Sequence, residues 1–277
     1  MGDCIYCKKP VGFLRVKHME CVKKHEQGVN ELMQILKNPL NPKKLLPDMV
    51  TQSRQIASDS YIDDKEYNQI VDRVWNACVE KVFEDGVLTE EEESRIKDIA
   101  TAFNFTQDKL NTDPAFIKVV QGSILRDILN GEIPSKFSAD ADLPFNFKSG
   151  EKLIWVFTCS YSEMKVVKQF VGSSQGYSVR IAKGVYYRAS AFKGMPIEKN
   201  IIAPVDAGLL AITDKSLYFA GSVKSFRIQY NKIITLMPYD NGVGIQREAQ
   251  TAKPQIFDVG SGWFIYNLLS NLFRMNH

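Results

Sequence analysis

The sequence predicts a multidomain α+β protein with three parts: a small cysteine- and histidine-rich N-terminus, an all-helical middle, and a β-barrel or sandwich capped by a C-terminal helix. Three observations predict this fold class. Cysteines and histidines gather within residues 4–25. Apolar residues recur at three- and four-residue spacing through residues 48–131, and alternating patterns with tight turns follow from residue 135. A chain of 277 residues is long enough for two or three domains.

The stretch "CIYCKKPVGFLRVKHMECVKKHEQG" holds three of the five cysteines and two of the three histidines. Cys4 and Cys7 form a Cys-x2-Cys pair, which aims two thiolates at one point. A second pair is either His18 with Cys21 or Cys21 with His25, and on a helix all three side chains share one face. Two close pairs of sulfur and nitrogen ligands are typical of a zinc site.

We favour Cys4, Cys7, His18 and Cys21 as the ligands, because His18 is nearer the start of the helix, where the chain returns from the Cys4–Cys7 turn. His25 is the alternative to His18. Four protein ligands leave no open position for water, so the predicted zinc is structural. A mini-domain over residues 1–38 is too small to be stable by apolar burial alone, and metal would supply the missing free energy.

Residues 39–47, "PLNPKKLLP", hold three prolines and are predicted to be a linker. Residues 48–132 are predicted to be a helical domain. Gly86 ends one helix, Thr89 and Glu92 form a capping box for the next, and Asp113-Pro114 opens another. One apolar stripe is formed by Ile70, Val71, Val74, Trp75, Cys78, Val79, Val82 and Phe83.

The acidic stretch "EDGVLTEEE" invites comparison with a calcium-binding EF-hand loop. With Gly86 aligned to the loop glycine, Lys81 and Phe83 occupy the first and third positions, where carboxylates are required. We therefore interpret the stretch as capped helix ends, with acidic residues favourably placed near a helix N-terminus.

Residues 135–277 are predicted to form strands that end in a helix over 261–275. Apolar residues alternate on both sides of a Lys183-Gly184 turn, and Asp240-Asn241-Gly242 is a strong hairpin signal. The helix carries one apolar side. Its members are Ile265, Leu268, Leu269 and Leu272.

These three stretches resemble known families. "CIYCKKPVGFLRVKHMEC" resembles the zinc-binding N-terminus of many bacterial and phage proteins, "DGVLTEEEESRI" resembles the TerB-like helical domain, and "ITDKSLYFAGSVKSFRIQYNKI" with "PQIFDVGSGWFIYNLLSNL" resembles PH-like or GRAM-like domains. The resemblance implies binding modules, with TerB-like domains associated with stress and phage-conflict systems. It implies no reaction.

The composition agrees with a non-enzymatic protein. The one histidine outside the cluster is His277, so Ser-His or Cys-His catalysis has almost no histidine to use, and no glycine-rich phosphate loop lies between a strand and a helix. The start "MGDCIYC" lacks the features of a signal peptide, and Cys78 and Cys159 stand alone, as buried thiols do in a reducing compartment. We expect a cytoplasmic protein.

The expected function is that of an adaptor that binds another protein. One alternative is nucleic-acid binding through the zinc mini-domain, although a net charge of +3 is too small to indicate this by itself. Its basic residues are Lys8, Lys9, Arg15, Lys17, Lys23 and Lys24, near Tyr6 and Phe13. A second alternative is an anionic membrane surface, bound through Lys165, Lys168, Arg180, Lys183 and Arg188.

Overall fold

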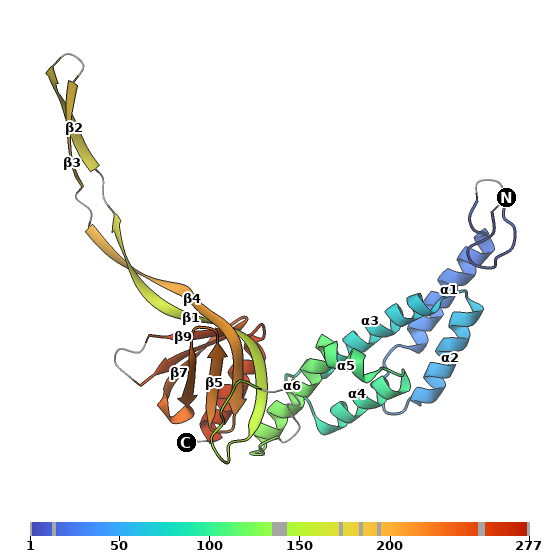
Figure 1. Cartoon of the computed structure of the whole chain (residues 1–277). Helices are drawn as coiled ribbons and strands as arrows, with labels where there is room; N and C mark the ends of the chain where they lie inside the picture. The colour runs from blue at the N-terminus through green and yellow to red at the C-terminus, as the bar shows by residue number, and fades with distance from the viewer. Residues whose placement is uncertain are drawn as a thin grey trace. The chain divides into compact units, whose positions relative to one another are not determined.

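The computed structural model describes residues 2–12, 15–134, 143–171, 174–182, 185–192, 195–248 and 253–275, with side chains described in these ranges except over 166–200. The chain divides into two compact units, Met1–Asn130 and Gly131–His277 (Figure 1). The first holds a cysteine–histidine cluster and helices, and the second a seven-stranded antiparallel sheet and a terminal helix. The predicted mixed α+β fold class is therefore confirmed.

The first unit contains six helices in its described residues. They are α1 (Met19–Ile35), α2 (Leu46–Asp59), α3 (Asp64–Val82), α4 (Glu90–Ala102), α5 (Gln107–Thr112) and α6 (Pro114–Leu129).

Local capping chemistry sets several of these helix starts. Thr89 and Glu92 make the predicted capping box at α4, and the Asp113 side chain accepts a hydrogen bond from the Phe116 N–H at the start of α6. Helix α3 ends at Val82 with Phe83 as its C-cap residue, before the helix end predicted at Gly86, which lies three residues further on and takes a φ of 81° without strain.

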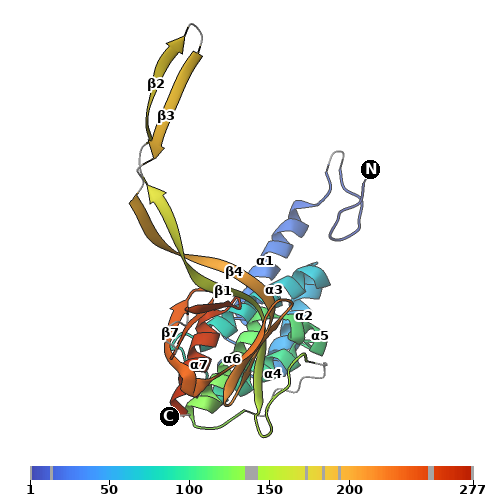
Figure 2. The ribbon, with the colours of Figure 1, turned by 60° about the vertical axis from the view of Figure 1, so that its left-hand side comes forward.

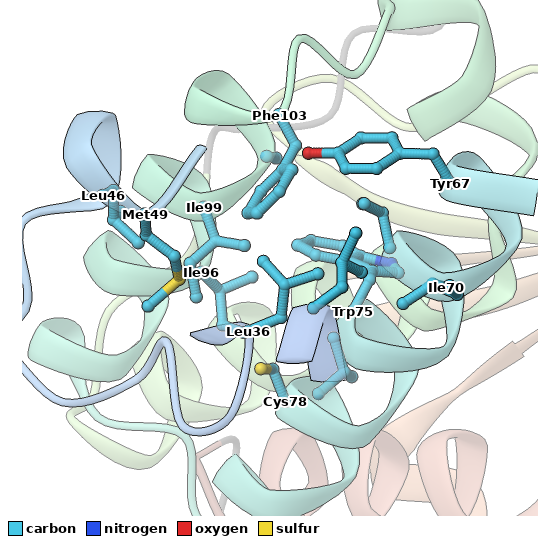
Figure 3. Close-up of a cluster of buried hydrophobic side chains, with 14 of the residues drawn as sticks. Leu36, Leu46, Met49, Tyr67, Ile70, Trp75, Cys78, Ile96, Ile99 and Phe103 are labelled. Atoms are coloured by element: carbon cyan, nitrogen blue, oxygen red, sulfur yellow. The ribbon is translucent and has the colours of Figure 1, made fainter. Parts of the chain in front are cut away.

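One apolar core contains residues from α1, α2, α3, α4 and the N-terminal half of α6. Figure 3 shows part of this core around Trp75 and Ile96. Leu32 and Leu36, which end the α1 region, are among its most buried members. The α1 helix, predicted to belong to a mini-domain over residues 1–38, therefore buries its apolar face against the helical unit.

Residues 39–47 are held by a single arginine. The Arg95 guanidinium donates hydrogen bonds to the carbonyl oxygens of Pro39, Asn41 and Lys44, each at 2.9 Å. Leu46 already belongs to α2. The predicted linker thus runs along the surface of α4 and is fixed to it by charge-assisted hydrogen bonds.

The sheet of the second unit has the order β6-β5-β4-β1-β9-β8-β7, and all its pairs are antiparallel. The helix α7 follows it. The elements are β1 (Leu153–Val171), β4 (Met195–Thr213), β5 (Ser216–Gly221), β6 (Ser225–Gln229), the 3-10 turn η1 (Tyr230–Lys232), β7 (Ile233–Tyr239), β8 (Gly242–Arg247), β9 (Gln255–Asp258) and α7 (Gly262–Met275).

The amphipathic helix α7 buries its apolar side on this sheet. Phe264 is fully buried, and its ring lies 5.2 Å from that of Trp155 and 5.7 Å from that of Phe157, both on β1. The predicted members of the apolar side are all buried. The helix therefore completes the hydrophobic core on its side of the sheet.

Strands β1 and β4 are 19 residues each. β9 pairs with β1 only between Ser160 and Glu163, whereas β4 pairs with β1 as far as Val171. Among the described residues the two strands thus run on as a two-stranded ribbon (Figure 2). A separate two-stranded sheet, β2 (Ser174–Ala182) and β3 (Val185–Phe192), lies between them in sequence. The predicted turn residues Lys183 and Gly184 lie outside the described residues.

In the part of the chain that the structure describes, no helix combines the length and the apolar character needed to cross a bilayer.

Candidate metal centre

The side chains of Cys4, Cys7, His18 and Cys21 converge on one point in the first unit. Their potential ligand atoms, three sulfurs and one ring nitrogen, all lie within 4.8 Å of one another. Cys4 and Cys7 flank the first turn of the chain, His18 is the N-cap residue of α1, and Cys21 lies in the first turn of that helix. The four residues are positioned to hold a metal ion.

A short hairpin-like turn presents the first cysteine pair. The Cys4 N–H donates to the Lys9 carbonyl at 2.8 Å, and the Lys8 N–H donates to the Cys4 carbonyl at 2.9 Å. Lys8 takes a φ of 57°, and Asp3 bridges to Pro10. These backbone contacts reverse the direction of the chain between Asp3 and Pro10. The reversal places the thiols of Cys4 and Cys7 on the same side of the turn. Residues 2–12 and 15–21 are called the knuckle below.

The tautomer of His18 suits metal binding. Its Nε2 lies 3.1 Å from the Pro10 carbonyl oxygen, which can only accept, so Nε2 carries the proton. Its Nδ1, with the lone pair, lies 3.4 Å from Cys7 Sγ and 3.8 Å from Cys21 Sγ. A backbone carbonyl that fixes the second ring nitrogen is the usual support for a histidine ligand. Although it is the N-cap residue, His18 makes no side-chain capping bond, because its ring faces the cluster.

His25, the alternative ligand, is not part of this cluster. Its Nε2 lies 2.8 Å from Glu66 Oε2 on α3, and its ring stacks on Tyr6 with centroids 4.8 Å apart. The structure thus places His18 with the three cysteines and gives His25 a partner on the neighbouring helix. His18 precedes α1 as its N-cap residue, whereas His25 lies further along the helix, where its ring reaches Tyr6 but not the cluster of ligand atoms.

The protonation of the four cluster residues is uneven. Desolvation opposes ionisation of Cys4, but hydrogen bonds from the backbone N–H groups of Cys7, His18 and Tyr6 lower its pKa to about 6. Desolvation and the neighbouring sulfurs of Cys7 and Cys4 raise the pKa of Cys21 to about 11. Hydrogen bonds with Cys7 and Cys4 raise the pKa of His18. Mutual repulsion among thiolates is what a bound cation would relieve.

Two residues beside the cluster were not foreseen from the sequence. Tyr61, in the turn between α2 and α3, has its ring centroid 6.0 Å from that of Tyr6, and its pKa is raised, first by desolvation and then by the charges of Cys21 and Cys7. Glu66 holds His25. Both lie about 40 residues from the cluster in sequence, so no local motif marks them.

The basic residues singled out in the knuckle and early α1 are exposed where described, and three of them have partners. Lys8 donates to the Ile5 carbonyl at 2.9 Å, Lys17 lies over the Tyr6 ring and Lys24 over the Tyr61 ring. Phe13 lies outside the described residues.

Of the basic residues considered for a membrane surface, Lys165 is exposed. Lys183 and the side chains of Lys168, Arg180 and Arg188 lie outside what the structure describes.

No protein-family model matches this chain, and no curated protein does. The donor set and its geometry are therefore what indicate the chemistry of the centre.

Proposed function

We propose that the cluster binds one structural zinc ion. The convergence of Cys4, Cys7, His18 and Cys21 within 4.8 Å carries the proposal. Three thiolates and one neutral imidazole are a common donor set of closed, tetrahedral zinc sites, and soft sulfur ligands disfavour magnesium and calcium. Such a zinc ion would tie the Cys4–Cys7 turn to the first turn of α1, and all four positions would be filled by protein.

Metal analysis of the purified full chain tests this proposal. We expect about one zinc per chain, released by a strong chelator, and loss of zinc in Cys21→Ser. The matched control is Cys159→Ala, which removes a buried thiol of the second unit. Stoichiometric zinc in the double variant Cys4→Ser, Cys7→Ser would overturn the assignment.

We infer that the whole protein is a non-enzymatic cytoplasmic adaptor, in a bacterial or phage stress or conflict system, with a TerB-like helical part and a PH-like protein-binding module. Seven antiparallel strands closed by one amphipathic helix support the PH-like resemblance. The helical packing of the first unit supports the TerB-like resemblance. Modules of these kinds bind partners by surface recognition.

The edge of β7 and the start of α7 are the surface that best supports protein binding. β7 is the last strand in the sheet order, and Ile234 is 60% exposed. Tyr239 and Trp263 expose 37% and 39% of their surface, and the Gly262 N–H bonds to the carbonyl of Asp240 in the β7–β8 turn, so both aromatic residues flank that turn. An edge strand beside exposed aromatic groups suits an added strand of a partner.

Affinity capture in the native host, followed by binding measurements with the purified partner, tests the adaptor proposal. We expect Ile234→Lys to weaken binding at least tenfold. Val87→Lys, at an apolar residue of the first unit that is 49% exposed, is the matched control and should bind normally. Equal affinity of both variants for every captured partner would exclude this surface.

Nucleic-acid binding through the knuckle is the first alternative. A hollow of about 460 Å³ lies beside His18, and its lining includes Arg15 and Lys17. Exposed basic side chains around a small concave surface can contact phosphates. A gel shift that weakens with salt, and is lost in Arg15→Gln with Lys17→Gln, would favour this alternative over the adaptor.

Anionic-membrane binding is the second alternative, favoured by exposed Lys165 where β1 passes beyond its pairing with β9. Flotation of the protein with liposomes that contain anionic lipid, and not with neutral ones, would support it.

A further inference from the structure

A chain of side-chain contacts runs from the knuckle into the helical core. Its first link is the stack of Tyr6, which lies between Cys4 and Cys7 in sequence, on His25 of α1, with an interplanar angle of 29°. The next link is the 2.8 Å contact between His25 and Glu66 of α3, in which the His25 side chain is only 13% exposed. The metal turn is thus connected to α3 through two side chains.

A second route reaches the cluster from the turn between α2 and α3. The Tyr61 ring lies 6.0 Å from that of Tyr6, the residue in the turn between Cys4 and Cys7, and the Lys24 ammonium of α1 lies 5.4 Å from the Tyr61 ring centroid. Tyr61 takes a φ of 59°, a conformation that a bulky residue adopts only where its surroundings demand it. This backbone conformation places the tyrosine against the knuckle.

The helix that carries Cys21 is itself packed closely on this turn. Gly28 of α1 approaches Ser60, and a Cβ at position 28 would lie 2.1 Å from the Ser60 Cβ. α1 and α2 therefore cross at near-backbone contact, one residue before Tyr61. The crossing limits how far the first turns of α1 can move relative to the α2–α3 turn.

We propose that Tyr61 and Glu66 are outer-shell positioning residues of the metal centre, and that metal occupancy and the stability of α3 are thereby coupled. This inference rests on the proposed structural metal site. Tyr61 packs beside Tyr6 of the ligand turn, while Glu66 orients His25 and, through the stack, the same Tyr6. Binding of a metal to the knuckle orders the turn, and the ordered turn stabilises the end of α2 and the start of α3.

Outer-shell residues typically change metal affinity by 10–100-fold when they are replaced. We expect Tyr61→Leu, which removes the ring that packs beside Tyr6, and Glu66→Gln each to weaken Zn²⁺ binding to the full chain about tenfold or more, in competition with a chromophoric chelator. The matched controls are Tyr239→Leu in the second unit and Glu84→Gln, an exposed acid after α3, and both should bind Zn²⁺ like the parent chain.

Hydrogen exchange followed by mass spectrometry gives the second readout. In the parent chain we expect removal of Zn²⁺ to speed amide exchange in peptides that cover Tyr61–Val71, with no change in the sheet of the second unit. In Glu66→Gln loaded with saturating Zn²⁺, part of this faster exchange should remain. The Co²⁺-substituted parent should show the absorption of tetrahedral thiolate coordination, with an altered spectrum in Tyr61→Leu.

The outcomes separate this inference from the proposed metal site. If the parent chain holds one Zn²⁺, and both variants match it in Zn²⁺ affinity and in amide hydrogen exchange, the proposed coupling is wrong and the metal site stands. If the parent chain binds no metal at micromolar Zn²⁺, both are wrong.

Discussion

The Nε2 of His18 donates to the carbonyl oxygen of Pro10 at 3.1 Å, and this one bond decides which nitrogen faces the three cysteines. Pro10 follows the Cys4–Cys7 turn, so the turn that supplies two thiols also orients the imidazole. The loop from Cys4 to Pro10 therefore supplies two of the four potential metal ligands and the carbonyl oxygen that orients a third. The first prediction follows from this arrangement.

His18→Ala should release the metal, whereas His25→Ala should retain it. His18 Nδ1 lies among the sulfurs, and His25 Nε2 is engaged with Glu66. Zinc content after extensive dialysis measures the difference. We expect well under half an equivalent for the first variant and about one for the second, and the reverse order would show that Cys21 and His25 form the second pair.

The sequence was sufficient wherever the determining residues are close together in the chain. The spacing of Cys4, Cys7, His18 and Cys21 predicted the cluster, and Thr89 with Glu92 predicted the cap of α4. In the capping box, and within each of the two ligand pairs, residues three positions apart in the chain set the local geometry.

Contacts that depend on packing could not be predicted in this way. Whether Cys21 is partnered by His18 or His25 depends on Glu66, a residue on another helix. Alternation of apolar and polar residues with a period of two predicts strands, but it does not predict where they end. The pairing of β1 with β4 as far as Val171 was therefore not foreseen. The packing of Leu32 and Leu36 with the helical unit also required the tertiary structure.

Arg126→Met should destabilise the first unit by about 3–5 kcal/mol, because it takes from the buried Glu93 carboxylate its buried cationic partner and leaves only the exposed Lys97. Glu93 is 7% exposed, and its Oε2 lies 2.6 Å from the Arg126 guanidinium. Desolvation opposes ionisation of Glu93, yet its hydrogen bonds with Lys97 and Arg126 lower its pKa. Denaturant unfolding measures the loss.

The double variant Glu93→Met, Arg126→Met should recover much of that stability, since it removes both buried charges. Lys97→Met is the matched control. The lysine also contacts Glu93, at 2.5 Å, but its side chain is 57% exposed, so a smaller loss of about 1 kcal/mol or less is expected. The prediction is contradicted if Arg126→Met proves as stable as the double variant, or more stable.

Asp206 should make the second unit sensitive to acid. Desolvation opposes its ionisation, but the backbone N–H groups of Lys224, Val223 and Ala207 and the Ser222 hydroxyl donate to the carboxylate and lower its pKa from 3.8 to about 2. A lowered folded-state pKa gives stability that is present above pH 3.8 and is lost as pH falls through about 2.

Unfolding of the parent chain and Asp206→Asn, measured from pH 5 to pH 2, tests this sign. The parent should be the more stable at pH 5, and the difference should shrink steadily below pH 3.8. A difference that is constant or grows toward pH 2 would show that the carboxylate's charge has no part in holding the β5–β6 turn.

Gly28→Ala should destabilise the first unit although it raises helix propensity. In the interior of an exposed helix this change gains about 1 kcal/mol. Here the new Cβ would lie 2.1 Å from the Ser60 Cβ and 3.6 Å from its Cα, so the helices must separate or shift. Overpacking of this kind costs about 1–3 kcal/mol, which exceeds the gain in propensity.

Removal of the opposing side chain is the matched test. In Ser60→Gly the Cβ and hydroxyl that meet the new methyl group are gone, so Gly28→Ala in that background should lose less stability than in the parent chain, or gain some. Thermal unfolding of the four proteins completes the double-mutant cycle. An equal loss in both backgrounds would mean that the α1–α2 crossing tolerates the methyl group and that another contact sets the cost.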